Sequence, residues 1–186
     1  MFFELLPSAA CYKGCFFFSS LLRRREFFRS PLQRPDTEDS MAVGQIRIVT
    51  FDDVLEYISS HERTSHDKGD LWERVCAWYL RNDPEMQQVV GRVWRWDDTD
   101  NPLHTGHDTG IDIVAERTDA PGTYWAVQCK NFDTGHKVSL NDLGTFFAAA
   151  EADECYTGVV VATVSGDISS NVDAHLLALC QNRGIT

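Results

Sequence analysis

Hydrophobic residues along this 186-residue chain follow two periods, one typical of helices and one typical of strands. Four segments space their apolar residues as amphipathic helices do: 50–60, 67–84, 139–150 and 168–180. Other stretches are rich in β-branched and aromatic residues and predict strands: 89–96, two runs of a hairpin within 109–131, and 157–164. This order predicts an α/β sandwich with a mixed central sheet, in which a helix after the hairpin leads to a parallel strand.

Local signals refine the predicted helices. The helix after the hairpin should begin at Ser139, which forms a capping-box pattern with Asp142. Thr50 and Asp53 have the same pattern at the start of the first helix. Gly184 is a plausible C-cap for the last one. In the second helix we expect one buried face, which carries Leu71, Val75, Trp78 and Tyr79. All five tryptophans occupy apolar positions, so we expect them in or beside the core.

The hairpin gathers the most informative polar residues of the chain. Its strands flank a Thr-Asp-Ala-Pro-Gly turn, and Pro and Gly supply the dihedral angles of a chain reversal. Alternation places Ile111 and Ile113 on one face of the first strand and Asp112 on the other. In the second strand Gln128 and Lys130 point the same way. If the strands pair so that their apolar faces are buried, a carboxylate, an amide and an ammonium group converge at one end of the sheet.

These residues carry a family resemblance. Gly110-Ile111-Asp112 followed by Gln128-Cys129-Lys130 resembles the core of the PD-(D/E)XK nuclease superfamily, in the Gln-containing variant of Mrr-like restriction endonuclease domains. With segments 68–73 and 93–96, the region 46–186 is similar to the N-terminal nuclease module of type ISP restriction enzymes and helicase-linked nucleases. The resemblance implies a restriction-endonuclease-like α/β/α sandwich. It also implies a further strand after Thr186, so we expect the chain to be truncated at its C-terminus.

The resemblance also implies a Mg²⁺-dependent site that hydrolyses phosphodiester bonds in DNA and accepts Mn²⁺ in place of Mg²⁺. Asp112 would be the principal ligand, completed by the side-chain oxygen of Gln128, the backbone carbonyl of Cys129 and, directly or through water, Glu73. Lys130 would orient the attacking water and stabilise developing negative charge. Without the resemblance, each residue has a purely structural interpretation. Glu73 would be a solvated helix carboxylate paired with a neighbouring arginine. Asp112 would be a charge on an edge strand, and Lys130 a solvated residue at a strand end.

Composition limits the partners of such a site. The formal net charge of −11 is unfavourable for DNA binding, because Lys and Arg supply most of the affinity for phosphates. We therefore expect this chain alone to hold DNA weakly. We also expect it to work with an attached or associated helicase, methyltransferase or recognition module. No apolar run approaches the ~20 residues of a transmembrane helix, so we expect no membrane partner. The six scattered cysteines are typical of reduced thiols, which predicts a cytoplasmic protein.

The first forty residues differ from the rest of the chain. They combine a Phe-rich stretch with Arg23-Arg24-Arg25 and an acidic segment that contains proline. We predict that 1–40 is a poorly structured extension, with Met41 as the natural start, and that 41–186 is the endonuclease domain. A short basic interfacial anchor is the alternative for this extension.

The sequence leaves open other interpretations of two histidines and of the function. His104 and His107 resemble a ligand pair, but no second pair follows at zinc spacing, so we expect two solvated loop histidines. A non-catalytic, truncated remnant that acts as a DNA-binding or interaction module is the main alternative function. A resolvase-like nuclease for branched DNA is another, and the acidic balance is unfavourable for it.

Overall fold

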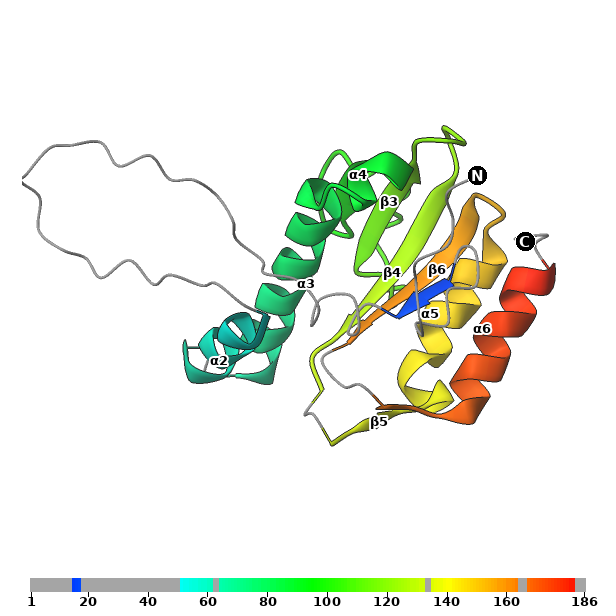
Figure 1. The fold of residues 1–186 in the computed structure, drawn as a ribbon. Helices are drawn as coiled ribbons and strands as arrows, with labels where there is room; N and C mark the ends of the chain where they lie inside the picture. The colour runs from blue at the N-terminus through cyan, green and yellow to red at the C-terminus, as the bar shows by residue number, and fades with distance from the viewer. Residues whose placement is uncertain (1–14, 18–50, 62–63, 133–134, 164–166, 183–186) are drawn as a thin grey trace, which may run out of the picture.

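The computed structural model describes residues 15–17, 51–61, 64–132, 135–163 and 167–182 (Figure 1). Their elements, in chain order, are β1 (Cys15–Phe17), α2 (Phe51–His61), α3 (Ser65–Asn82), α4 (Met86–Val89), β2 (Val90–Arg95), β3 (Ile113–Arg117), β4 (Tyr124–Lys130), β5 (Lys137–Val138), α5 (Leu140–Ala152), β6 (Tyr156–Thr163), β7 (Asp167–Ile168) and α6 (Ser170–Asn182). The four predicted helices and the strands of the predicted sheet are all present. α4 and the short strands β1, β5 and β7 were not predicted.

The central sheet has five strands in the order β1-β6-β4-β3-β2. β3 pairs antiparallel with both β2 and β4, whereas β6 runs parallel to β4 on one side and to β1 on the other. The predicted hairpin, helical crossover and parallel neighbour are therefore confirmed. β5 and β7 form a separate two-stranded parallel sheet that leads into α5 and α6.

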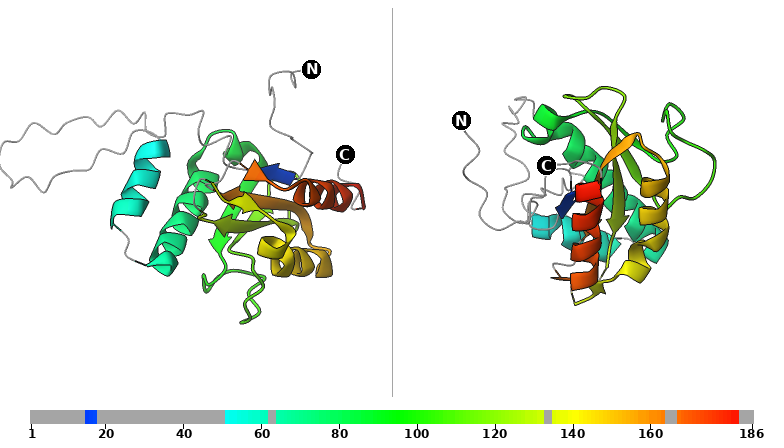
Figure 2. Two further views of the ribbon diagram at one scale, coloured as in Figure 1. Left: turned by 90° about the horizontal axis from the view of Figure 1, so that it is seen from below. Right: turned by 90° about the vertical axis from the view of Figure 1, so that its right-hand side faces the viewer.

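Helices cover both faces of the central sheet, which makes the predicted α/β/α sandwich (Figures 1 and 2). One core lies between the sheet and α2, α3 and α4, and it contains Ile113 and Val127. The other lies under α5 and α6 and contains Val114 and Ala126. The two sets alternate along β3 and β4, as the period of a strand requires. β6 contributes to both cores, because consecutive residues of this central strand are buried on opposite faces.

α3 meets the sheet with a different face from the predicted one. Thr64 caps the helix and accepts a hydrogen bond from the backbone N–H of Asp67 at 3.1 Å, so α3 begins two residues earlier than expected. Trp72 is fully buried and its indole N–H donates to the carbonyl of Ala162 at 3.2 Å. Trp78 is 39% exposed, so its predicted place in the core was wrong. The sheet side of α3 is defined by Trp72, Cys76, Tyr79 and Leu80 instead.

Ile111 was also assigned to the wrong core. It packs with Val114 under α5 rather than with Ile113. The reason is local: β3 begins only at Ile113, and Gly110 turns the chain just before it with a φ of 70°. Strand alternation therefore does not extend back to Ile111.

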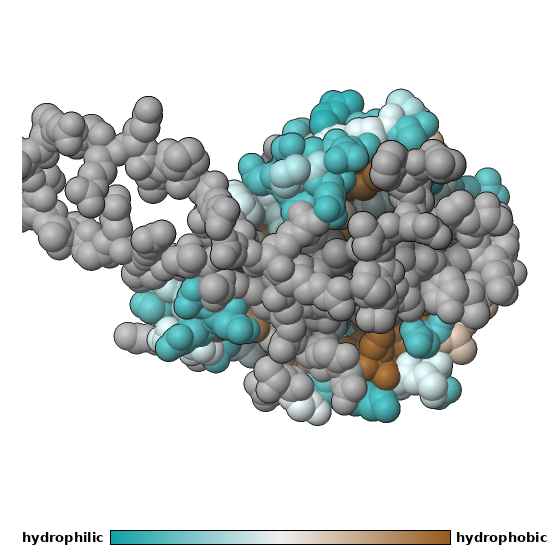
Figure 3. All heavy atoms as spheres, in the orientation of Figure 1, coloured by the Kyte–Doolittle hydropathy of each residue, from teal (hydrophilic) through white to brown (hydrophobic). Residues whose placement is uncertain are grey.

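Some predictions lie outside the described residues. These are the cap at Thr50, the C-cap at Gly184 and the boundary at Met41. The predicted capping box is present, because Asp142 accepts from the backbone N–H of Ser139 at 2.8 Å. On the face seen in Figure 3 the described side chains are mostly hydrophilic, with small apolar areas between them. No helix in the described ranges is long and apolar enough to span a bilayer.

Candidate active site

Asp112 stands where three strands approach one another. It directly precedes β3, and the register that pairs Ile113 with Val127 places it opposite Gln128. Its backbone N–H donates to the carbonyl of Val127 at 2.9 Å, and its carbonyl accepts from the N–H of Trp96 at 2.7 Å. The backbone at Asp112 is thus held on both sides, by β4 and by the end of β2.

The carboxylate of Asp112 is held by the opposite strand. Its Oδ2 accepts a hydrogen bond from Nε2 of Gln128 at 2.8 Å and another from the backbone N–H of Cys129 at 2.5 Å. Burial raises the pKa of Asp112, while these two hydrogen bonds and the charge of Lys130 act in the opposite direction. Gln128 is 4% exposed, so its amide is sheltered from water. One oxygen of the carboxylate is therefore fixed by donors at the end of the sheet.

Glu73 faces this carboxylate from α3. Its pKa is raised to about 7, first by burial and then by the negative charge of Asp112, which Arg95 partly offsets. Within the described part of the chain it forms no ion pair with a neighbouring arginine. Arg74 pairs with Asp70 at 2.9 Å and Arg81 donates to the carbonyl of Val93 at 2.7 Å instead. A half-buried carboxylate with a second carboxylate nearby does not correspond to a solvated helix residue.

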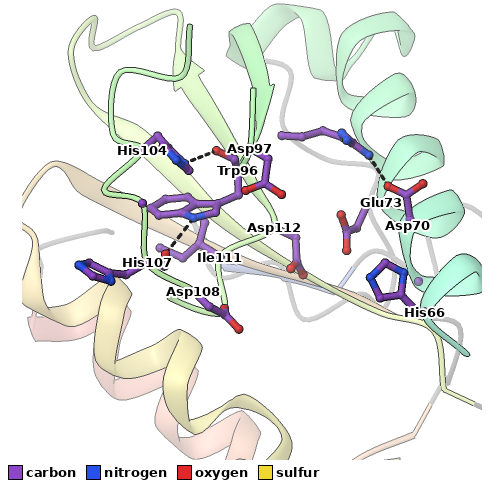
Figure 4. Close-up of a pocket in the computed structure, with 13 residues that line it drawn as sticks. His66, Asp70, Glu73, Trp96, Asp97, His104, His107, Asp108, Ile111 and Asp112 are labelled. Carbon is purple, nitrogen blue, oxygen red and sulfur yellow. Dashed lines mark hydrogen bonds and ion pairs between the residues drawn. The ribbon is translucent and has the colours of Figure 1, made fainter. Parts of the chain in front are cut away.

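A cavity of about 500 Å³ opens over these two acids (Figure 4). One wall is the start of α3, with His66, Asp70 and Glu73, and the other is the loop after β2, with Trp96, Asp97 and the predicted solvated pair His104 and His107. Asp108 and Asp112 complete a lining that contains five carboxylates and one arginine, Arg95. A pocket with this charge favours cations.

Arg95 is held in place by Asp70. Its Nη1 lies 2.7 Å from Oδ1 of Asp70, while Arg74 reaches the other oxygen of that carboxylate. Although burial acts to raise the pKa of Asp70, the hydrogen bond from Arg95 and the charge of Arg74 lower it. The pair joins α3, which carries Glu73, to the end of β2, the strand that pairs with β3 beside Asp112.

All five predicted site residues lie at this end of the sheet, with two qualifications. The amide nitrogen of Gln128, rather than its oxygen, faces Asp112. Gln128 and Lys130 do not line the cavity, whereas Glu73 and Asp112 do. Asp70 and Asp108 belong to the cavity and were not predicted. The helical spacing of Asp70 and Glu73, three residues apart, was the available signal for the first.

The donors suit a hard divalent cation. Carboxylate, amide and carbonyl oxygens are the ligands that Mg²⁺ takes in proteins. The charge of Asp112 opposes the ionisation of Glu73, and a bound cation would favour it. Within the residues that the structure describes, no three His, Cys, Asp or Glu side chains gather closely enough to bind a metal ion. The predicted set contains only two such side chains, so a metal here would depend on the oxygens of Gln128 and Cys129 and on water.

Comparisons with known proteins bear on the fold as a whole. Residues 81–183, more than half of the chain, match the Mrr_cat_2 family model, which is described as restriction endonuclease. A solved structure of the ATP-dependent type ISP restriction-modification enzyme LlaBIII bound to DNA is similar, with a TM-score of 0.52 and 25% sequence identity. The similarity covers 67% of this chain and 7% of that chain. No curated protein matches.

Proposed function

Because the chain belongs to the Mrr_cat_2 family of restriction endonucleases, we propose that it is a metal-dependent nuclease that hydrolyses phosphodiester bonds in DNA for a restriction system. One observation carries the proposal: the carboxylate of Asp112, held by the opposite strand, faces Glu73 across an acidic cavity. The family match includes Asp112, Gln128 and Lys130 but begins after Glu73. The role of Glu73 therefore rests on its position alone.

The residues of the candidate site divide into ligands of the metal ion and a lysine that acts on the reacting groups. Asp112, Glu73, the carbonyl of Cys129 and the side chain of Gln128 would hold Mg²⁺ or Mn²⁺, and a half-turn of the Gln128 amide would present its oxygen. The bound ion would supply positive charge to the scissile phosphate and acidity to a water molecule. Lys130 orients the attacking water and stabilises negative charge as it develops. Its charge acts on Asp112, which supports a place beside the reacting groups.

We propose further that the chain is the nuclease module of a larger, helicase-linked enzyme. The chain spans only 7% of the length of LlaBIII, a chain described as ATP-dependent and bound to DNA. The net charge of −11 also supports this proposal, because phosphate affinity would have to come from an attached or associated module. Recognition of a DNA sequence would then lie outside this chain.

Nicking of supercoiled plasmid by the purified chain tests the site. With Mg²⁺ or Mn²⁺ at low salt we expect cutting that EDTA abolishes and that falls at least ~100-fold in Asp112→Ala and Lys130→Ala, since each removes a group that acts on the developing charge. Asp52→Ala and Lys137→Ala change exposed residues of the same types and should cut like the wild type. No cutting by a folded chain, alone or joined to a motor module, would favour the non-catalytic remnant.

A further inference from the structure

The loop after β2 is held together by internal hydrogen bonds. Nδ2 of Asn101, a residue only 7% exposed, donates to the carbonyl of Trp96 at 2.9 Å, and Oδ1 of Asn101 accepts from the N–H of Leu103 at 3.1 Å. The indole N–H of Trp96 donates to the carbonyl of His107 at 3.0 Å. Residues 101–107, which we call the loop tip, are therefore held in one shape against Trp96, although they contain no helix or strand.

The loop tip differs in charge from the rest of the cavity. Its sequence, Asn-Pro-Leu-His-Thr-Gly-His, contains no carboxylate, although Asp100 and Asp108 flank it directly. The opposite wall carries Asp70 and Glu73, and the one arginine of the lining is already engaged by Asp70. A DNA backbone is repelled by the carboxylates of the α3 wall. The loop tip is the side from which it meets least repulsion.

The ring of His104 is oriented by its contacts. Its Nδ1 lies 2.9 Å from the carbonyl of Trp96, and because a carbonyl can only accept, Nδ1 must carry the proton. The ring also packs against Trp96, with centroids 5.6 Å apart. His104 is exposed and lines the cavity, so Nε2 is left to face a ligand. Nε2 donates only in the imidazolium form, which supplies a hydrogen bond and a positive charge together.

Given the DNA cleavage proposed above, on which this step rests, we propose that the loop tip contacts the DNA backbone beside the scissile phosphate and that His104 binds a neighbouring phosphate there. Figure 4 places His104 and His107 across the cavity from Glu73 and Asp70, with Asp112 between the two walls. A strand that lies along the loop tip would thus bring its next phosphate toward Asp112. The contact reads no bases, so it gives position and not sequence specificity.

His61 offers a matched control. It is also exposed, its Nδ1 lies 3.1 Å from the carbonyl of Tyr57, and its ring stacks on that tyrosine at 4.1 Å, but it is on α2 and outside the cavity. His61→Gln therefore removes the same kind of side chain and the same kind of contacts. Any change seen only in His104→Gln belongs to the position of His104.

The test is binding of a short fluorescein-labelled duplex, followed by anisotropy in Ca²⁺ over a series of salt concentrations. Near pH 6 we expect His104→Gln to bind more weakly and to lower the dependence of log K on log salt by about 0.9, the value of one phosphate contact. His61→Gln should behave as the wild type.

Thr105→Asp is a second variant, and it leaves the hydrogen bonds of Asn101, Trp96 and His104 unchanged. Thr105 is exposed at the loop tip, and a carboxylate there should weaken binding by repulsion. Unchanged affinity and salt dependence in both His104→Gln and Thr105→Asp would overturn the proposal, as would a folded wild type that binds no DNA. If the wild type binds as described but never cuts, the proposed nuclease function fails while the loop-tip contact stands.

Discussion

Glu73 and Asp112 are two carboxylates with different surroundings. Asp112 receives two hydrogen bonds and feels the charge of Lys130, all of which favour its ionised form against the effect of burial. Glu73 has no such donor within the described residues, and both burial and Asp112 favour its protonated form. When no cation is present, the structure therefore carries an electrostatic cost at Glu73 near neutral pH, which a metal ion would remove.

Glu73→Gln should stabilise the metal-free protein above neutral pH. The pKa of Glu73 is about 7 in the fold against a model value of 4.5, so the folded state binds this proton more tightly than the unfolded state. Stability from the bound proton is fully present below 4.5 and is lost as pH rises through 7. We expect the free energy of unfolding of Glu73→Gln to exceed that of the wild type by on the order of 1–2 kcal/mol near pH 8, allowing for solvent screening, and to equal it near pH 4.5.

Urea unfolding in EDTA at several pH values measures this difference. Glu56→Gln, an exposed glutamate on α2, is the control and should match the wild type throughout. A gain of stability that does not vary with pH would mean that Gln packs better than Glu. It would contradict the electrostatic explanation.

Among the elements, the turn into β3 decides where Asp112 lies. Gly110 has a φ of 70°, and a Cβ at this position would lie 3.1 Å from the backbone nitrogen of Phe146 on α5. The same Cβ would lie 3.4 Å from Oε1 of Gln128. Glycine is therefore required here for two reasons, its backbone dihedral angles and its lack of a side chain. The turn packs directly on α5 and sets Asp112 two residues later.

Gly110→Ala should lower both stability and activity. We expect a loss of roughly 2–3 kcal/mol in the free energy of unfolding, from strain and from contact with backbone that must shift. Gly122→Ala is the control, because Gly122 has a similar φ of 82° but open space around its Cβ. It should cost about 1 kcal/mol, the strain alone. Plasmid nicking should fall about 100-fold in Gly110→Ala, since displacing Asp112 by about an ångström moves it out of the geometry that the reaction needs, and little in Gly122→Ala. Equal effects of the two substitutions would contradict the role of Phe146.

Local sequence patterns predicted most elements, and the errors have local causes. Strand alternation correctly assigned Ile113, because it lies inside a paired strand. It failed at Ile111, which precedes the strand. Helical periodicity found α3 but could not tell which apolar stripe meets the sheet, since Trp72 and Trp78 are equally hydrophobic. Burial is decided by where the helix docks, and its docking depends on distant partners such as Ala162.

The candidate site was predictable where it follows a motif and not where it depends on tertiary contacts. Asp112, Gln128 and Lys130 were found through their spacing in a hairpin. Asp70 was missed because its role comes from Arg95, 25 residues away, and only the fold brings the two together. The loop tip was missed for a similar reason, because its shape depends on hydrogen bonds to Trp96 that no periodic pattern reports.

At the scale of the whole molecule, negative charge is the dominant property. The chain carries 28 acidic and 17 basic residues, and five carboxylates line one cavity. General repulsion of this kind lowers stability and weakens contact with DNA, and any cation relieves it to some extent. A specific metal site must therefore be distinguished from a general response to ionic strength.

Mg²⁺ should raise the thermal stability of the protein through the candidate site. An ion at ten times its Kd adds about 1.4 kcal/mol if it binds only the folded state. For a chain of this size that corresponds to a rise of roughly 3–5 °C in Tm. Asp112→Asn should abolish the rise, because it removes the charge of the principal ligand, and NaCl of equal ionic strength should not reproduce it. An equal rise in Asp112→Asn would mean that Mg²⁺ acts on the overall charge. No rise in the wild type would contradict the assigned ligands, even if the nuclease family is correct.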